Sequence, residues 1–229
     1  CGKSPHKQTD LVVKAWQRNP HYPKLVITAS GSIYSGLKKR LLSVGDPSGS
    51  LVNIQLMNNV PKEEYEALQQ KAGLYVCPSL KEGWGHYLNE GRATGAVVMT
   101  TDSAPMNELI DQESGLLVET TTECQRAWFA LGCGYPTTVE AIENAMERFL
   151  HMSNDQREQL GRRALKKYKH DTAYLKDVLV GNKVAILHPS NLSAVKVRTK
   201  RFVNYRRCGR IVGGLLVLVA LVVYLLRRK

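Results

Sequence analysis

Two glutamates separated by seven residues stand in the segment EGWGHYLNE, which runs from Glu82 to Glu90. Carboxylates accept hydrogen bonds from neutral hydroxyl groups, and a sugar or a ribose offers such hydroxyls in pairs. Gly83 and Gly85 leave the backbone bare between the two acids, where a helix-like pattern begins near His86. Exposed amides at a helix N-terminus attract anions such as a diphosphate, because the orphan N–H groups and the helix dipole converge there. The segment therefore favours a ligand that carries both hydroxyls and phosphates.

The same spacing also fits a simpler alternative, in which one acid starts a helix and the other is a solvated residue within it. The neighbouring elements favour the ligand site. An apolar strand over 73–78 precedes the glycines, and a strand of buried type over 96–100 follows the helix. Ser103 and Pro105 then start another helix,. This alternation is typical of a parallel sheet, which binds ligands at the carboxyl ends of its strands.

Lys3 and Lys7 stand in a polar loop ahead of an amphipathic run that begins at Leu11. Lysines in such a loop are commonly only solvated. Next to a phosphate, however, an ammonium group supplies a point charge, although it lacks the bidentate fork of arginine. Taken alone, the two lysines leave both interpretations open.

The run from Cys77 to Leu117 resembles the donor-binding half of retaining GT-B glycosyltransferases, in particular family 4. That family carries E-G-F/W-G-x-x-x-x-E, a G-x-x-V-x-x-T/S-D strand, a glutamate and a G-L/Y-L-V segment. The chain matches these in order with EGWGHYLNE, GAVVMTTD, Glu108 and residues 115–118. The family also opens this half with a Gly-Arg pair and a lysine. Gly2-Lys3 and Lys7 hold these positions here, with lysine in place of arginine at Lys3.

The resemblance implies a role for each matching residue. Glu82 would be the catalytic residue that holds the transferred sugar, and Glu90 would bind the donor ribose. The donor-binding residues that it implies are Lys3, Lys7, Gly83, Trp84, Gly85 and Glu90. The lysines and loop amides would neutralise the diphosphate, so we expect no metal and no cofactor beyond the nucleotide sugar. The sequence contains no Asp-x-Asp motif that would hold a divalent ion.

We predict an α/β fold with a Rossmann-like parallel sheet and helices on both faces, which corresponds to one GT-B half. The predicted strands are 24–30, 51–57, 73–78, 96–100 and 115–118, and the predicted helices are 9–18, 61–71, 86–94, 104–111, 137–151 and 154–169. Turn chemistry predicts a loop from Ser43 to Ser50. The expected domains are a donor-binding domain over 1–180, a basic linker over 181–207 and a membrane anchor over 208–229.

The positive charge of the chain is concentrated in its tail. Eleven of the 32 Lys and Arg residues, and none of the 20 acidic ones, lie after residue 177. Binding of the whole protein to nucleic acid is therefore not expected. The segment Ile211–Leu226 is uncharged and apolar, and its sixteen residues span about 24 Å as a helix,. A buried core helix is the alternative, but arginine clusters at both ends favour a transmembrane helix of a thinner bilayer.

The number and spacing of the cysteines help to predict the cellular compartment of the protein. The five of them are odd in number and show no C-x-x-C spacing, so neither a zinc site nor a complete set of disulfides is indicated,. Cys77, in a buried strand, is predicted to be a core residue. We expect a single-pass protein whose soluble domain faces the cytosol, where sugar nucleotides are made and thiols stay reduced. The sequon at Asn191 would be glycosylated only in a secretory lumen,.

Two function classes remain open at this stage. The first is a glycosyltransferase that moves a hexose from a nucleotide diphosphate sugar with retention, to a glycan, lipid or protein acceptor. The second is a non-catalytic, membrane-anchored remnant that binds nucleotide sugars, because no pattern of an acceptor-binding domain is found in the chain. About 150–200 further residues of α/β pattern upstream would favour the enzyme.

Overall fold

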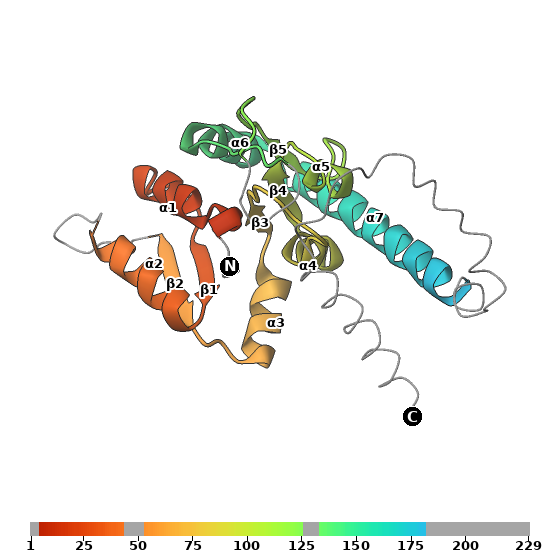
Figure 1. Ribbon diagram of the computed structural model, residues 1–229, viewed down its shortest axis with the longest axis horizontal. Coiled ribbons are helices and arrows are strands. Elements are labelled where there is room, and N and C mark those ends of the chain that lie inside the picture. Colours follow the sequence, from red (N-terminus) through yellow and green to blue (C-terminus); the bar gives the residue numbers. More distant parts are fainter. Residues whose placement is uncertain (1–4, 44–52, 126–132, 182–229) are drawn as a thin grey trace, which may run out of the picture. The chain divides into compact units, whose positions relative to one another are not determined.

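The computed structural model describes residues 5–43, 53–125 and 133–181 (Figure 1). Lys3, the predicted anchor and the linker beyond residue 181 lie outside these ranges. Within them, no helix is long and apolar enough to cross a membrane. The chain divides into a compact unit up to Lys176 and a second unit from Asp177 onward. The fold and site described below belong to the first unit.

The strands form two sheets in which every pairing is parallel. One sheet has two strands in the order β1-β2, and the other has three in the order β3-β4-β5. Their bounds are β1 Leu25–Ala29, β2 Ile54–Asn58, β3 Leu74–Cys77, β4 Val97–Thr101 and β5 Leu116–Val118. Because all pairings are parallel, the carboxyl ends of paired strands lie at one edge of each sheet, as the alternating sequence pattern predicts.

Helices join the strands and cover them. The helical elements are η1 Pro5–Lys7, α1 Thr9–Arg18, α2 Gly31–Ser43, α3 Lys62–Lys71, α4 His86–Thr94, α5 Met106–Leu109, α6 Val139–His151 and α7 Asn154–Gly181. Six of the eight match predicted helices. Helix α2 was not predicted, and it includes Ser43, the first residue of the predicted loop; the other residues of that loop, 44–50, lie outside the described ranges. The apolar pattern of α2 is interrupted by glycines and serines, although its Leu37 is buried.

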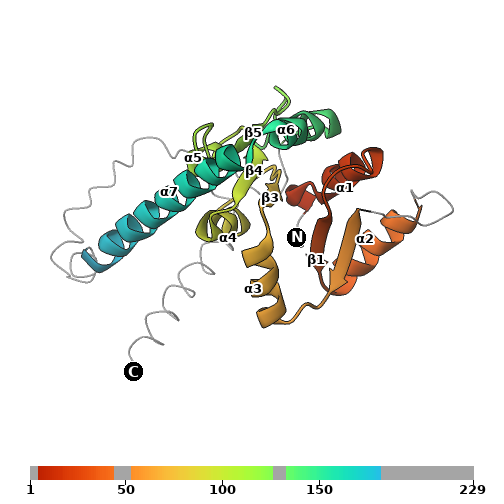
Figure 2. The same cartoon turned by 180° about the vertical axis from the view of Figure 1, so that it is seen from behind.

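The three-stranded sheet carries helices on both faces, as predicted. Val97 and Met99 pack into a core cluster with α1 and α6. Val98, one residue along the same strand, packs instead with Leu88 of α4 and Met106 of α5. Side chains alternate between the faces of a strand, so the two clusters lie on opposite faces. Figures 1 and 2 show α6 and α4 on different sides of β4.

Residues of both sheets meet in one core. The cluster that contains Val97 also holds Ile27 of β1, Ile54 of β2 and Leu37 of α2. The side chain of Trp16 in α1 belongs to the same cluster, and its indole nitrogen donates to the carbonyl of Pro23, 2.8 Å away. A buried indole with a satisfied N–H group contributes large apolar area without an orphan donor.

A disulfide joins Cys124 and Cys133, whose Cα atoms are 5.2 Å apart. An antiparallel bridge between Gln125 and Gly134 brings the two cysteines together. The sequence indicated no complete set of disulfides, and this single bond was not predicted, because a separation of nine residues shows no recognisable motif. Cys77 is a free, buried residue of the core, as predicted.

Candidate functional site

The segment η1 lies along the exit of β3. The backbone N–H of Leu80 donates to the carbonyl of His6 at 2.7 Å, and the amide nitrogen of Gln8 donates to the carbonyl of Pro78 at 2.8 Å. These two bonds flank Lys7 and place its side chain beside the loop between β3 and α4. Two segments that are far apart in the sequence therefore form one site.

Glu82 is the centre of this site. Its side chain is only 9% exposed and pairs with the ammonium of Lys7. The hydroxyl of Ser79 donates to the same carboxylate oxygen, Oε1, at 2.5 Å. Oε2 has no partner among the described residues. Ser79 is fixed in turn, since the hydroxyl of Thr101 in β4 donates to its carbonyl. The predicted catalytic residue is thus held through Oε1 by two partners, Lys7 and Ser79.

Tyr87, in the first turn of α4, contacts Lys7 and Ser79, the two residues that bond to Glu82. The ammonium of Lys7 lies 3.8 Å from the centre of its ring, and its hydroxyl is hydrogen bonded to Ser79. Burial raises the pKa of the Tyr87 phenol, so its ring stays neutral. Sequence reasoning assigned no role to Tyr87 or to Ser79. The only feature of the sequence that could have indicated a role for Tyr87 is its position inside the EGWGHYLNE segment.

The glycine loop leads into α4. Gly85 has a φ of +68° and occupies the position before the helix, and a side chain there would place Cβ 2.8 Å from a methyl carbon of Leu109. Glycine accepts this left-handed conformation without strain, whereas a larger residue there would be strained and would require the Leu109 side chain to shift,. Trp84 is 55% exposed. No side chain caps the start of α4, so the first amides of the helix remain without a helical partner,.

Glu90 lies one turn further along α4. Its Oε2 accepts a hydrogen bond of 2.7 Å from the hydroxyl of Tyr65 in α3. Burial, together with this bond, raises the pKa of Tyr65. Tyr65 also lines a cavity of about 490 Å³ at the carboxyl ends of β1 and β2, together with Thr28 and Asn59. Glu90 is therefore linked through Tyr65 to a cavity at the strand ends, where parallel sheets bind ligands,.

A second cavity, of about 640 Å³, runs beside α4. Gly83, Trp84 and Glu90 line it together with residues of α5 and α7. Glu82 is not among the lining residues of either cavity. The expectation that Glu82 and Glu90 point into one cleft therefore stays a prediction.

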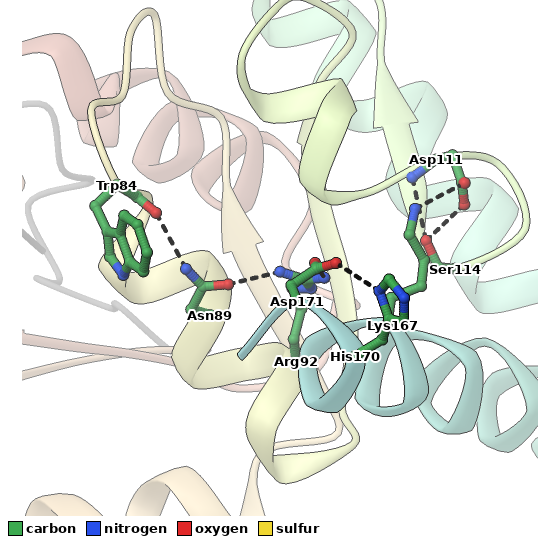
Figure 3. Close-up of polar contacts among 8 residues, drawn as sticks. All are labelled: Trp84, Asn89, Arg92, Asp111, Ser114, Lys167, His170 and Asp171. Atoms are coloured by element: carbon green, nitrogen blue, oxygen red, sulfur yellow. Dashed lines mark hydrogen bonds and ion pairs between the residues drawn. The ribbon is translucent and has the colours of Figure 1, made fainter. Parts of the chain in front are cut away.

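Arg92 connects the glycine loop to α7 (Figure 3). Its side chain is 1% exposed, pairs with Asp171 and donates to Oδ1 of Asn89 at 2.7 Å. Asn89 donates in turn to the carbonyl of Trp84 at 3.0 Å. A guanidinium only donates, so the amide oxygen of Asn89 must face Arg92 and its nitrogen must face Trp84. The conformation of the loop is thus linked to a residue of α7.

A second contact of α7 lies next to this one (Figure 3). Lys167 donates to one carboxylate oxygen of Asp111 at 2.8 Å, and Ser114 donates to the other at 2.6 Å. These bonds lower the pKa of Asp111 to about 2. The loop after α5 is held against α7 in this way.

The structure brings the predicted residues together in part. Lys7 and Glu82 are in contact. The loop that follows Glu82 consists of Gly83, Trp84 and Gly85, and Glu90 lies in α4, the helix that begins after this loop. Sequence reasoning missed Ser79, Tyr87 and Tyr65. In the described part of the chain, no group of three or more His, Cys, Asp or Glu residues is placed to hold a metal ion.

The sequence of the chain matches a known protein family. The glycosyl transferases group 1 family matches residues 3–127, which is more than half of the chain. The chain belongs to this family. The matched region contains every residue of the predicted donor site. No curated protein sequence matches the chain.

Solved structures support the same fold of this glycosyltransferase chain. The C-terminal domain of a glycosyl transferase group 1 family protein from Francisella tularensis has 19% identity and a TM-score of 0.57, with 74% of this chain and 81% of that domain covered. Sucrose-phosphate synthase from Thermosynechococcus elongatus has 18% identity and a TM-score of 0.60, with coverages of 81% and 44%. Anabaena HepE in complex with UDP-glucose has 13% identity and a TM-score of 0.55, with coverages of 73% and 42%.

The coverages differ in an informative way. The chain spans most of the Francisella C-terminal domain but less than half of the synthase and of HepE. At these identities the likeness establishes the fold alone. The fold is one Rossmann-like half of the GT-B type, as the sequence predicts.

Proposed function

We propose that this chain is the donor-binding half of a glycosyltransferase that moves a hexose from a nucleotide diphosphate sugar to an acceptor with retention of configuration. The observation that carries the proposal is the contact between Lys7 and Glu82, which lie 75 residues apart in the sequence. It brings together, after the end of the parallel strand β3, a cation that can bind phosphate and a carboxylate that can bind sugar hydroxyls. The family of the chain and its likeness to HepE, solved with UDP-glucose, support a nucleotide sugar as donor.

We assign each part of the donor, the diphosphate, the ribose and the sugar, to different residues of the site. Lys7, helped by Lys3 and the amides around Gly83 and Gly85, neutralises the diphosphate without a metal ion. Glu90 binds the ribose, next to the cavity at the ends of β1 and β2 that would receive the base. Glu82 uses its open oxygen to bind a hydroxyl of the transferred sugar. The acceptor is a glycan, a lipid or a protein.

In the proposed transfer, negative charge develops on the diphosphate as its bond to the sugar breaks, and this charge needs stabilisation. The bond between the anomeric carbon and the diphosphate oxygen breaks, and its electron pair leaves with the diphosphate. The acceptor oxygen bonds to the same face of that carbon, and its proton passes to the leaving diphosphate oxygen. Lys7 and the amides at the start of α4 oppose the charge that develops on the leaving group, which is the type of stabilisation that contributes most to many enzymes.

Substitution of the two glutamates tests the proposal. Glu90→Ala should weaken the binding of both the nucleoside diphosphate and its sugar conjugate, since a lost charge-assisted hydrogen bond costs about 1.5–3 kcal/mol. Glu82→Ala should weaken only the sugar conjugate or its turnover. Calorimetry with UDP, GDP, ADP and their glucose conjugates measures both. Wild-type affinities in both variants would rule the assignment out. Binding without turnover in the presence of acceptors would favour the non-catalytic alternative.

We further propose that the segment 208–229 anchors the protein in a membrane, with the donor domain toward the cytosol. The apolar run and its flanking arginines support the anchor, and the supply of sugar nucleotides supports the cytosolic side,. The Cys124–Cys133 disulfide argues for the opposite side, because such bonds persist mainly in oxidising compartments,.

Deletion of residues 206–229 tests the anchor and its side. The truncated protein should move to the soluble fraction with unchanged nucleotide affinity. An intact chain that carbonate extraction removes from membranes would disprove the anchor. Glycosylation at Asn191, detected as a mobility shift that Asn191→Gln abolishes, would place the donor domain in the lumen.

A further inference from the structure

Tyr87 contacts the site in two chemically different ways. Its ring lies below the ammonium of Lys7, and its hydroxyl is bonded to Ser79, which donates to Glu82. Lys7 is the proposed partner of the diphosphate, and Glu82 is the proposed partner of the sugar. One side chain therefore contacts both parts of the site, through its ring on one side and its hydroxyl on the other.

The direction of the hydrogen bonds follows from the groups involved. The Glu82 carboxylate only accepts, so the single proton of the Ser79 hydroxyl must point toward it. The oxygen of Ser79 must then accept from Tyr87. The chain of donors thus runs from Tyr87 to Ser79 to Glu82, and it fixes the rotamer of the Ser79 hydroxyl. A donor chain of this kind polarises each bond along it.

The ring acts on Lys7 separately. A lysine side chain has four flexible carbons and an ammonium with no preferred direction of approach, so its position depends on what surrounds it. Ring and ammonium are 3.8 Å apart, well within the range of a cation–π contact,. This contact does not need the Tyr87 hydroxyl.

We infer that Tyr87 is a positioning residue of the donor site, whose ring holds Lys7 for the diphosphate and whose hydroxyl orients Glu82, through Ser79, for the transferred sugar. The inference rests on the proposed function, since it assigns Lys7 and Glu82 their ligands from there. It adds that the two effects are carried by different atoms of one residue. Substitutions at Tyr87 therefore separate them.

Calorimetry on the full chain in neutral detergent tests this separation. The probes are a nucleoside, its diphosphate and its diphosphate glucose, with the base chosen as the one that wild type binds most tightly among uridine, guanosine and adenosine. Tyr87→Phe keeps the ring and removes the hydroxyl. It should leave the diphosphate within about twofold of wild type and weaken the sugar conjugate about fivefold, the effect of one hydrogen bond.

Tyr87→Leu removes both contacts. It should weaken the diphosphate and the sugar conjugate alike, each by about fivefold or more, and leave the nucleoside unchanged. Ser79→Ala should reproduce the pattern of Tyr87→Phe, and the double variant should be no weaker than Ser79→Ala alone, because both act through one donor chain. Melting curves of each variant show whether it is folded.

Tyr75→Phe is the matched control. Tyr75 is a half-buried tyrosine of β3 whose hydroxyl donates to the carbonyl of Gln69, and it contacts neither Lys7 nor Glu82. Removal of the Tyr75 hydroxyl should change the affinity for none of the three probes. Equal weakening of all three probes by Tyr87→Leu would mean general damage, and equal weakening of diphosphate and sugar conjugate by Tyr87→Phe would remove the division of roles. Either result overturns the inference.

The failure of the proposed function gives a different pattern. If wild type binds none of the nucleotides, or if Glu82→Ala and Glu90→Ala bind like wild type, the donor site itself is wrong and the role of Tyr87 falls with it. If wild type binds them and both Tyr87 variants match it, the donor site stands and the inference about Tyr87 is wrong.

Discussion

Two cation–carboxylate pairs join distant parts of this chain. Lys7 meets Glu82 across 75 residues, and Arg92 meets Asp171 across 79. The pairs differ in which partner is buried. In the first pair the carboxylate is the more buried side chain, whereas in the second the guanidinium is 1% exposed and its carboxylate is about half exposed.

The two cations differ in how freely they can change partner. Lys7 is a flexible point charge that is 18% exposed, so we expect a ligand to compete with Glu82 for it,. Arg92 lines the second cavity but is 1% exposed and bonded to residues of α4 and α7, so we expect it to keep these partners. A cation–carboxylate contact therefore indicates a ligand site only together with the exposure and flexibility of its cation.

The largest expected effect is on the stability that Arg92 provides. Asp171→Ala leaves a buried guanidinium without its carboxylate, so the free energy of unfolding should fall by about 2–4 kcal/mol. Nucleoside diphosphate binding should persist in the folded fraction, because Lys7 is untouched. Urea unfolding measures the first quantity and calorimetry the second.

The control is an exposed pair on the same helix. Glu158 accepts from Arg162 at 2.6 Å, with both side chains more than half exposed. Glu158→Ala should lower the free energy of unfolding by no more than about 0.5 kcal/mol. Equal losses in the Asp171 and Glu158 variants would contradict the contrast between buried and exposed arginine.

The next effect is on binding at Lys7. Lys7→Ala should reduce affinity for a nucleoside diphosphate about 10- to 100-fold, the usual effect of a charge-assisted hydrogen bond, and should hardly change affinity for the nucleoside. It should also lower the free energy of unfolding, by about 1–3 kcal/mol, since the largely buried Glu82 loses its cation and keeps only its bond from Ser79,.

Metal dependence is measured in the same experiment. Chelator should leave the wild-type affinity unchanged. Loss of binding in chelator, with wild-type affinity in Lys7→Ala, would assign the diphosphate to a metal ion instead of to this lysine.

The smallest effect concerns the pH dependence of stability near α7. The pKa of Asp111 is lowered from 3.8 to about 2, chiefly by its bond from Lys167. A lowered carboxyl pKa stabilises the fold above pH 3.8, and this contribution disappears as the pH falls toward 2. Asp111→Asn should therefore lower the melting temperature at pH 6, and the difference from wild type should shrink between about pH 4 and pH 2. A constant difference over that range would contradict the assignment.

The order of elements could be predicted because the strands are short apolar runs and the glycines mark the loops. Helix α2 could not, since its interrupted pattern gives no clear apolar face even though Leu37 is buried. The Cys124–Cys133 bond was missed for a related reason. It depends on the register of an antiparallel bridge, which no local spacing encodes.

The site shows the same limit. The motif identified Glu82, Glu90 and the glycine loop, which are contiguous in the sequence. Ser79, the partner of Glu82, lies three residues before the motif, and Tyr65, the partner of Glu90, lies in α3. Hydroxyl residues are too common for their types to mark a site. Only the packing of α3 against α4 brings Tyr65 to Glu90.

The Cys124–Cys133 bond also affects how the protein has to be handled. Gly134, next to Cys133, lies so close to Leu80 that an added Cβ would be 2.7 Å from a side-chain carbon of that residue. Leu80 precedes Glu82 by two residues, so Gly134, the neighbour of Cys133, borders the donor segment. A reductant added to protect the thiol of Cys77 would break the neighbouring disulfide. Affinities measured with and without reductant therefore belong to two covalent forms of the protein and should not be pooled.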